Sequence, residues 1–482
     1  MSGSSGSSGS NGLSGARPIV VADRPSPGRP RPYVFPPFRR TRLDNGLSVL
    51  SVHLPGRLLV EASLIIVGGA SDEAPERAGA TVLMARALTE GTEHYSAIEL
   101  VEATERLGAS LHAEAGWDAV SVSADVPVEH LAATLDLMAE VIARPTFPAG
   151  EVERLRDERL NDLLQARADP RRRAEEAFIE TIYASGSPYR RPAGGIRETV
   201  EQLDATAARD ELARRFDPAR MTLVVGGDLT GLDVDALAGA RFGGWLAEPA
   251  ALPPATVDAS AASSERRIRI IHRPAAVQTE IRVGHPGLPR RIPDFHAVAV
   301  MSAILGGLFN SRLNRKLREE KGYTYGASAG FDLRRAAGPF AARAAVNTEA
   351  TVPALLDMMT ELEAIRSASV DESELRAARD YLVGVFPLRF ETPGAVVGAL
   401  TGLVAQDLPD DELARYRPSI EAVTADDALA AAQAHVRPDE AAIVLVGDAD
   451  AFLPALEAAG LGSVSVEHEA ANSMEALDLA AD

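Results

Sequence analysis

Residues 216–237 read FDPARMTLVVGGDLTGLDVDAL, and residues 436–456 repeat their plan as VRPDEAAIVLVGDADAFLPAL. Each stretch places a proline turn before an apolar run, and a Gly-Asp pair between that run and a helix-like segment. Pro218 and Pro438 are 220 residues apart, and the two Gly-Asp pairs keep the same offset. The shared offset indicates an internal duplication, so we expect two domains of one architecture.

The beginnings of the two blocks correspond as well. Residues 63–84, SLIIVGGASDEAPERAGATVLM, parallel residues 279–301, TEIRVGHPGLPRRIPDFHAVAVM. Between the blocks, residues 248–265 are rich in Ala, Pro and Ser, which is typical of a flexible linker. The expected organisation is, in chain order, a disordered Gly/Ser/Pro-rich tail (1–33), a first domain (34–245), a linker (246–265), a second domain (266–456) and an acidic tail (457–482).

Each block mixes strand-like and helix-like patterns in a similar order. Residues 46–54 and 60–68 read as paired strands, and residues 96–108 as a capped helix. Long alternating hairpins are expected over residues 109–126 and, in the second block, over residues 323–346. Hairpins among helices predict an α+β fold, in which each domain is a mainly antiparallel sheet backed by helices.

Composition narrows the classes of partner and of chemistry. The 482 residues are 46% hydrophobic and carry a net charge of −20, which argues against nucleic acid and anionic membranes as main partners. There is no cysteine, which excludes disulfides, thiolate metal sites and a cysteine nucleophile. No run of 18 apolar residues occurs, and the Gly/Ser-rich start lacks the pattern of a signal peptide. We therefore expect a cytoplasmic protein that binds neither nucleic acid nor membrane.

The helix-like segment 78–92, AGATVLMARALTEGT, has the frame of a metal-binding helix without its ligands. On a helix, two histidines at i and i+4 with a glutamate at i+3 form the inverted zinc motif His-x-x-Glu-His. The corresponding residues here are Val82, Ala85 and Arg86. None of them can ligate zinc, and Arg86 would repel it. By themselves, these three residues indicate nothing more than an ordinary amphipathic core helix.

The frame around this helix resembles the insulinase-like zinc peptidases, family M16. The family's stretch Ala-Gly-Leu-Ala-His-Phe-Leu-Glu-His-Met-Leu-Phe-Lys-Gly-Thr aligns without a gap, and the matching positions here are Ala78, Gly79, Leu88, Gly91 and Thr92. In this alignment the family's histidines fall on Val82 and Arg86, and its glutamate falls on Ala85.

The resemblance also places the family's third zinc ligand, a glutamate on a later helix. It falls near Asn161 and Asp162, where no glutamate stands. The nine histidines are scattered, and no two are spaced i, i+3 or i+4. We therefore expect no metal in this chain, and the resemblance implies Zn²⁺ in a partner subunit.

Residues 304–330, ILGGLFNSRLNRKLREEKGYTYGASAG, resemble the family's signature in its C-terminal domain. There an arginine and a tyrosine seven residues apart form a pair, matched here by Arg318 and Tyr325. The resemblance implies that this pair faces the zinc, holds the substrate backbone and stabilises the oxyanion. The alternative is an Arg318 paired on the surface with Glu319 or Glu320, and a tyrosine packed in the sheet.

The resemblance covers about residues 43–456 and implies two αββαβ-type domains, one clamshell half of the LuxS-metallopeptidase-like type. It leads to the hypothesis of a non-catalytic subunit, inactive alone, in a heterodimeric M16 metallopeptidase. A paralogous partner would carry the zinc motif, and the pair would process peptides. Two alternatives remain open: a structural scaffold subunit of a larger assembly, and a stand-alone peptide-binding module.

Overall fold

The computed structural model describes residue 28 and residues 31–468, so most of the expected N-terminal tail lies outside the described residues. Within residues 31–468, no helix is both long and apolar enough to cross a bilayer.

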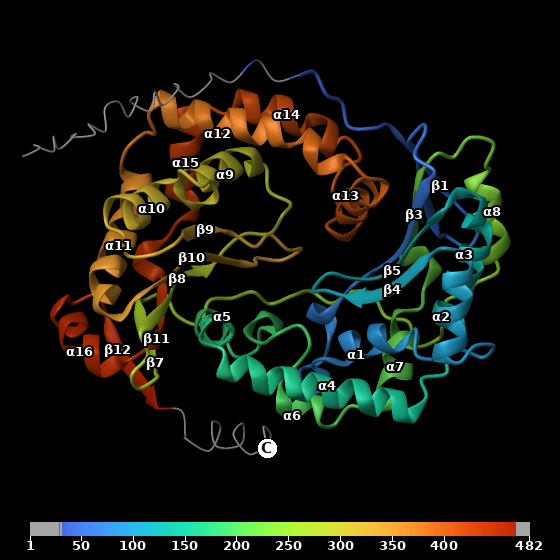
Figure 1. Cartoon of the computed structure of the whole chain (residues 1–482), viewed down its shortest axis with the longest axis horizontal. Coiled ribbons are helices and arrows are strands. Elements are labelled where there is room, and N and C mark those ends of the chain that lie inside the picture. Colours follow the sequence, from blue (N-terminus) through green and yellow to red (C-terminus); the bar gives the residue numbers. More distant parts are fainter. Residues whose placement is uncertain (1–27, 29–30, 469–482) are drawn as a thin grey trace, which may run out of the picture. The chain divides into compact units, whose positions relative to one another are not determined.

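The first half contains a six-stranded sheet that is mainly antiparallel (Figure 1). Its spatial order is β1-β2-β6-β3-β5-β4, and only the β2–β6 pair is parallel. The strands are β1 (Phe38–Arg42), β2 (Ser48–His53), β3 (Leu59–Val67), β4 (Ser110–Ala115), β5 (Ala119–Pro127) and β6 (Met221–Gly227).

The second half repeats this sheet in the order β12-β7-β11-β8-β10-β9. Five strands correspond one to one with the first sheet, including a parallel β7–β11 pair like β2–β6. The sixth strand differs, because the edge strand beside β7 comes last in the chain instead of first, and it runs parallel to β7. The strands are β7 (Arg267–His272), β8 (Gln278–Pro286), β9 (Ala327–Phe331), β10 (Pro339–Asn347), β11 (Ala442–Gly447) and β12 (Ser463–His468).

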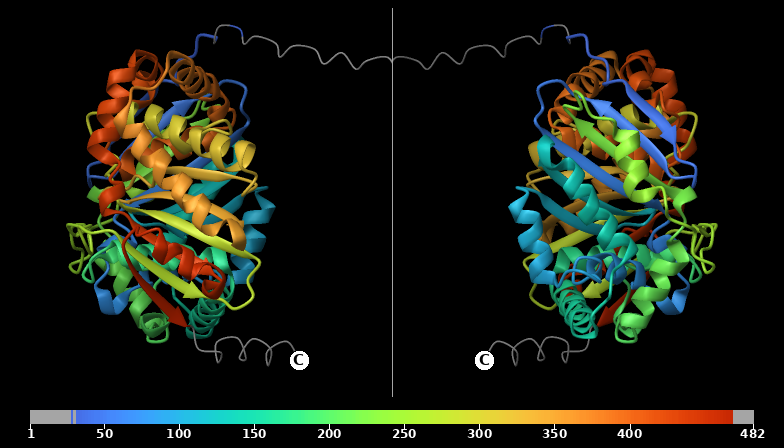
Figure 2. Two further views of the ribbon diagram at one scale, coloured as in Figure 1. Left: turned by 90° about the vertical axis from the view of Figure 1, so that its left-hand side faces the viewer. Right: turned by 90° about the vertical axis from the view of Figure 1, so that its right-hand side faces the viewer.

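Strand β12, red in Figure 2, extends the second half beyond residue 456, where the sequence analysis ended it. The segment that was expected to be a tail therefore completes a sheet as far as residue 468. Strand β12 was not predicted because it is an edge strand in which most residues are exposed or half-buried. It therefore lacks the continuous apolar run that indicated the central strands β6 and β11.

One core lies between the first sheet and its own helices, among which α1 packs on β4 and α3 packs on β5. The helices of the first half are α1 (Ala80–Ala87), α2 (Ala97–Arg106), α3 (Leu131–Ala143), α4 (Ala149–Ala168), α5 (Pro170–Ile182), α6 (Arg197–Val200), α7 (Ala205–Arg215) and α8 (Val234–Phe242).

A second core lies between the second sheet and the helices of the second half. Two wide π-helical turns, residues 303–307 and 315–320, interrupt its regular helices. The helices are α9 (Phe295–Ser302), α10 (Arg312–Asn314), α11 (Thr351–Ser367), α12 (Glu372–Val385), α13 (Pro393–Ala405), α14 (Glu412–Ala422), α15 (Ala425–His435) and α16 (Ala449–Ala458).

Each half also covers the other half's sheet with one helix. Helix α5 packs against β8 and β11, while α13 packs against β3 and β6, as Figure 1 shows for α13 and β3. Glycines permit the close approach: a Cβ on Gly226 would come within 2.7 Å of Val397 Cγ2, and one on Gly284 within 2.9 Å of Phe178 Cζ. Every residue of β6 and β11 is buried, because helices cover both faces of these strands.

The linker between the halves is tied to the first half by backbone contacts. Ala255 donates its N–H to Asp72 (3.0 Å), Ala262 donates to the Ile182 carbonyl (2.8 Å), and Ser260 accepts from Ala184 (2.9 Å). The segment has almost no regular secondary structure, as its Ala/Pro/Ser composition suggests, but it is anchored rather than free.

Candidate functional site

Helix α1 carries the three positions that correspond to the zinc motif. It begins after Gly79, whose φ of 99° and close approach to the Gly194 carbonyl leave no room for a side chain. Ala85 is buried, Val82 is half-buried and Arg86 is exposed. The predicted amphipathic helix is therefore present. Its exposed face carries the guanidinium of Arg86, which has no lone pair to offer to a metal.

Arg86 is held by an ion pair with the neighbouring helix α4. Its Nη2 lies 2.7 Å from Glu158 Oε2, and Arg154 Nη1 lies 2.6 Å from the other oxygen of the same carboxylate. Arg154 also contacts Glu90, 2.8 Å away, just beyond the end of α1. The arginine at the motif's last position has thus become part of a surface charge network that joins α1 to α4.

The third-ligand position is occupied in the same way. Asp162 on α4 forms ion pairs with Arg159 and with Arg172, the latter at 2.7 Å, while Asn161 is exposed. Arg159 turns its Nε to the Gly194 carbonyl at 2.9 Å. The carboxylate at this position therefore already has two cationic partners.

The residues at the motif positions do not fit zinc. The space lined by Val82, Arg86 and Arg159 has a volume of about 10 Å³, which is at most room for one water. Two guanidiniums line it, and neither Val82 nor Ala85 has a donor atom. The chemistry of these side chains supports neither a catalytic metal nor a metal-bound water at these positions.

Arg318 lies in the second π-helical turn, residues 315–320. Its guanidinium carbon stacks 4.4 Å from the ring centroid of Phe309, whose side chain is 67% exposed. Among the described residues it makes no ion pair, and Glu320 instead pairs with Lys316 at 3.2 Å. The alternative of a surface salt bridge with Glu319 or Glu320 is therefore not what the structure has, and Arg318 is half-buried.

Tyr325 is 93% exposed and stands two residues before the edge strand β9. The alternative of a tyrosine packed in the sheet is thus also absent. The described structure records no hydrogen bond between the phenol of Tyr325 and Arg318, so the two side chains are near in sequence but not bonded to each other.

Asn314 is a buried residue that the sequence analysis did not identify. Its Oδ1 accepts from the Ala327 N–H at 2.8 Å, and its Nδ2 donates to the Leu308 carbonyl at 3.2 Å. One side chain therefore ties the loop of Phe309 to the strand that follows Tyr325. An asparagine inside a helix-like run is a weak helix former, and that is the one local signal of a tertiary role.

The free edges β4 and β9 belong to equivalent strands of the two sheets. Beside β4 a mainly apolar groove of about 350 Å³ runs against α2, lined among others by Leu100, Val101 and Leu111. An exposed strand edge can accept an extended peptide as a further strand, with side chains seated in an adjacent groove.

A group of His272, Asp448 and Asp450 in the second half has potential metal ligands within 4.8 Å of one another. However, His272 Nδ1 accepts the Ala449 N–H at 3.0 Å, so the neutral ring carries its proton on Nε2. Asp448 Oδ2 accepts from the Ala275 N–H at 3.1 Å. Both side chains are therefore used to fasten the end of strand β7 to the turn after β11.

The first half has the same fastening, which argues for a structural role in both. His53 Nδ1 accepts the Leu229 N–H at 3.1 Å, and Asp228 Oδ2 accepts the Gly56 N–H at 2.9 Å. The duplicated Gly-Asp pairs of the sequence are thus duplicated hydrogen bonds in the structure.

Comparison with known proteins agrees with this architecture. The family profile described as Insulinase (Peptidase family M16) matches residues 48–192, and the profile described as Peptidase M16 inactive domain matches residues 202–382. Among curated relatives, an uncharacterized zinc protease of Mycobacterium bovis is 26% identical over 76% of this chain and 83% of its own length. A non-peptidase homolog of Helicobacter pylori is 24% identical over 67% of this chain and 74% of its own.

Solved structures are similar over nearly their whole length. The peptidase M16 inactive domain of Pseudomonas fluorescens superposes with a TM-score of 0.79 at 25% identity, covering 85% of this chain and 98% of that one. A protease of Helicobacter pylori shares the fold with a TM-score of 0.77 at 18% identity, covering 86% and 100%. With both halves matched and both six-stranded sheets in place, the chain belongs to peptidase family M16, and it carries an inactive-type domain.

Proposed function

We propose that this chain is the non-catalytic subunit of a heterodimeric M16 metallopeptidase. A paralogous partner would hold Zn²⁺ in an intact His-x-x-Glu-His helix, and this chain would supply Arg318 and Tyr325 to the bound peptide. The observation that carries the proposal is a contrast between the two halves. Arg86 and Asp162, at positions that correspond to zinc ligands, are held in ion pairs, whereas the half-buried Arg318 and the exposed Tyr325 are not paired with a carboxylate among the described residues.

The chemistry of the pair suits a peptide in an extended conformation. A guanidinium presents fixed N–H donors to a carbonyl oxygen, and a phenol adds an O–H donor. Donors aimed at the charge that develops on a scissile carbonyl are worth about 10²–10³ in rate. Tyr325 stands two residues before the free edge strand β9, so a peptide lying along that edge would pass close to it.

Compartment and partners follow from composition as part of the same proposal. An acidic chain with net charge −20 does not favour nucleic acid, and the lack of cysteine suits the reducing cytoplasm.

The test is reconstitution of the complex. The chain purified alone is expected to bind no stoichiometric zinc and to cleave no peptide, and co-purification from the native host is expected to yield a paralogue with the zinc motif. Mixing the two should give a zinc-dependent peptidase activity that neither has alone. Tightly bound zinc in this chain, or full activity of the partner by itself, would contradict the proposal.

A stand-alone peptide-binding module is the second candidate, because the groove beside β4 is formed by this chain alone. It predicts measurable peptide affinity without any partner. A structural scaffold predicts neither peptide affinity nor any loss of function on substitution of Arg318 and Tyr325.

A further inference from the structure

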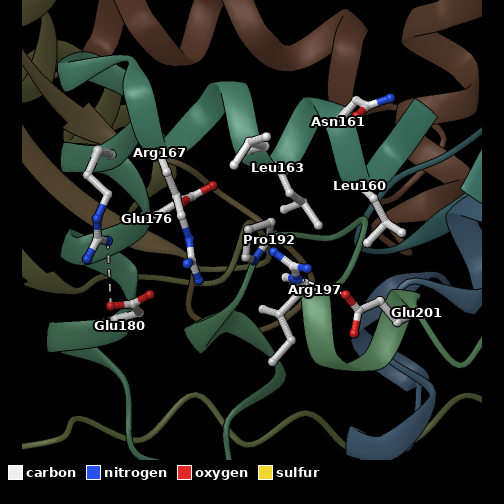
Figure 3. Close-up of a pocket in the computed structure, with 12 residues that line it drawn as sticks. Leu160, Asn161, Leu163, Arg167, Glu176, Glu180, Pro192, Arg197 and Glu201 are labelled. Atoms are coloured by element: carbon white, nitrogen blue, oxygen red, sulfur yellow. Dashed lines mark hydrogen bonds and ion pairs between the residues drawn. The ribbon is translucent and has the colours of Figure 1, made fainter. Parts of the chain in front are cut away.

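A separate cavity of about 220 Å³ lies between α4, α5 and the segment that leads into α6 (Figure 3). Of the positions that correspond to zinc ligands, Asn161 lines this cavity, whereas Val82, Ala85, Arg86 and Asp162 do not. The cavity is distant in sequence from Arg318 and Tyr325. Pockets for drug-sized ligands usually measure about 300–1,000 Å³. This smaller volume suits a single small metabolite.

Most of the charged groups around the cavity already have partners. Arg197 Nε lies 2.7 Å from Glu201 Oε1. Arg173, which is buried, lies 3.8 Å from Glu180 and 3.5 Å from Glu467. Two further charged side chains of opposite sign line the cavity and are not part of these ion pairs.

Those two side chains are Glu176 on α5 and Arg167 near the end of α4. Neither side chain makes a hydrogen bond or an ion pair within 4 Å among the described residues, and both face the cavity (Figure 3). Glu176 is half-buried, and burial raises the pKa of its carboxyl, against a lowering by Arg173. Arg167, which is exposed, also acts on this carboxyl without a hydrogen bond to it. A half-buried carboxylate that lacks a hydrogen-bond donor is stabilised when an N–H donor reaches it.

The rest of the lining is apolar. Leu160 and Leu163 project from α4, and Pro192 and Ile196 come from the segment before α6. Figure 3 shows Leu160 away from Glu176 and Arg167, at the other side of the space. The cavity thus offers an acceptor and a donor of opposite charge beside a surface for a hydrocarbon group.

We propose that this cavity binds a free amino acid with an apolar side chain. Its ammonium group would be held by Glu176, its carboxylate by Arg167, and its side chain among Leu160, Leu163 and Ile196. Charge-assisted hydrogen bonds at both ends would give such a ligand its orientation. The site is independent of the proposed peptidase role and would exist in the isolated chain.

The first test uses the unmodified full-length chain and L-leucine as the probe, measured by calorimetry and by saturation-transfer NMR. Saturable binding is expected at millimolar or lower concentration. N-acetyl-L-leucine, which lacks the ammonium, and L-leucinamide, which lacks the carboxylate, should each bind at least about tenfold more weakly. Equal binding of either analogue, or no saturable binding of leucine, would overturn the proposal.

The second test locates the site with matched charge changes. Glu176→Gln and Arg167→Gln should each weaken leucine binding by at least about tenfold. Glu153→Gln and Arg171→Gln remove the same charges from exposed positions of α4 and α5 that do not line the cavity, and should bind as the unmodified chain does. If the Glu176 and Arg167 variants fold and still bind leucine normally, this cavity is not the site.

Discussion

The two halves share one sheet topology, yet their chemically important helices have developed in opposite ways. In the first half, Arg86 and Asp162 are bound in ion pairs at the positions where the family resemblance places zinc ligands. In the second half, Arg318 and Tyr325 have no ionic partner among the described residues, and Tyr325 is almost fully exposed. The difference teaches that the charged groups at the zinc positions are neutralised within this chain, whereas Arg318 and Tyr325 keep donors that a ligand could use.

The largest expected effect concerns what now supports the first half. Glu211 on α7 is 1% exposed and accepts from Thr81 Oγ1 on α1 and from Arg215 Nε, both at 2.8 Å. Glu211→Ala would remove the nearest carboxylate of the buried Arg215 and leave it Asp72 at 3.6 Å, so we expect a loss of roughly 3 kcal/mol in the free energy of unfolding. Urea denaturation measures it, with the exposed Glu153→Ala as control. A loss no larger than that of the control would show that α1 does not depend on this network.

The same carboxylate predicts a pH dependence. Burial alone would raise its pKa, but Arg215 and Arg214 lower it to about 2, from an ordinary value of 4.5. A lowered folded-state pKa stabilises the fold above pH 4.5, and this contribution is lost as the pH falls from about 4.5 towards 2. The difference in free energy of unfolding between the unmodified chain and Glu211→Ala should therefore decrease as the pH falls from about 4.5 towards 2. Urea unfolding curves at both ends of this pH range would measure it.

In the second half, the expected effect is on rate and not on stability. In the reconstituted complex, Arg318→Ala and Tyr325→Phe should each lower kcat/KM by at least about tenfold, because each removes a donor to the developing oxyanion. Melting temperatures should stay nearly unchanged, since Tyr325 is almost fully exposed and Arg318, which is half-buried, stacks only on the exposed ring of Phe309. Arg318→Lys should restore little, because an ammonium lacks the planar fork.

Lys321→Ala is the matched control for these two variants, because it removes an exposed cation three residues from Arg318. It should leave kcat/KM unaltered. If the Arg318 and Tyr325 variants are as active as this control, the pair is not functional and the scaffold hypothesis gains.

A smaller effect is expected where α13 covers the first sheet. Glu61 on β3 lies opposite Asp125 on β5. Helix α13 lies close above the Glu61 carboxylate, because a Cβ added to Gly394 would be 3.4 Å from Glu61 Oε2. Burial, together with Asp125, raises the pKa of Glu61 to about 7. The folded state then holds a proton that the unfolded chain releases, so stability falls as the pH rises from about 4.5 to 7.

Glu61→Gln should remove this fall. Its melting temperature, relative to that of the unmodified chain, should therefore be higher at pH 8 than at pH 5. A constant difference between the two proteins at both pH values would mean that Glu61 does not titrate as its surroundings imply.

The smallest effect is expected from rebuilding the lost motif. The triple change Val82→His, Ala85→Glu and Arg86→His should not confer stoichiometric zinc binding, because Asp162 stays paired with Arg159 and Arg172 and the space is only about 10 Å³. Metal analysis after dialysis would check this. Zinc retained by the triple variant would mean that the three substitutions alone are enough to create a metal site in the first half.

The sequence predicted the parts of this molecule that depend on local pattern. The repeated proline turns and Gly-Asp pairs gave the two sheets, and the frame of residues 78–92 gave α1 and its missing ligands. The exchange of α5 and α13 could not be predicted, because nothing in an amphipathic run says which sheet it will cover. Asn314 was not identified for a related reason. Its role depends on the Leu308 carbonyl and the Ala327 N–H, which the fold brings to its side chain.

That exchange of helices has a consequence for how the chain could be divided. Cleavage within residues 246–265 would give two fragments. In each fragment one face of the sheet would lose the helix that covers it, because α13 is in the second fragment and α5 is in the first. Neither fragment should be stable by itself, but the two mixed together should find each other and restore the whole. The packing of α5 on β8 and β11, and of α13 on β3 and β6, thus joins the two halves in addition to the covalent linker.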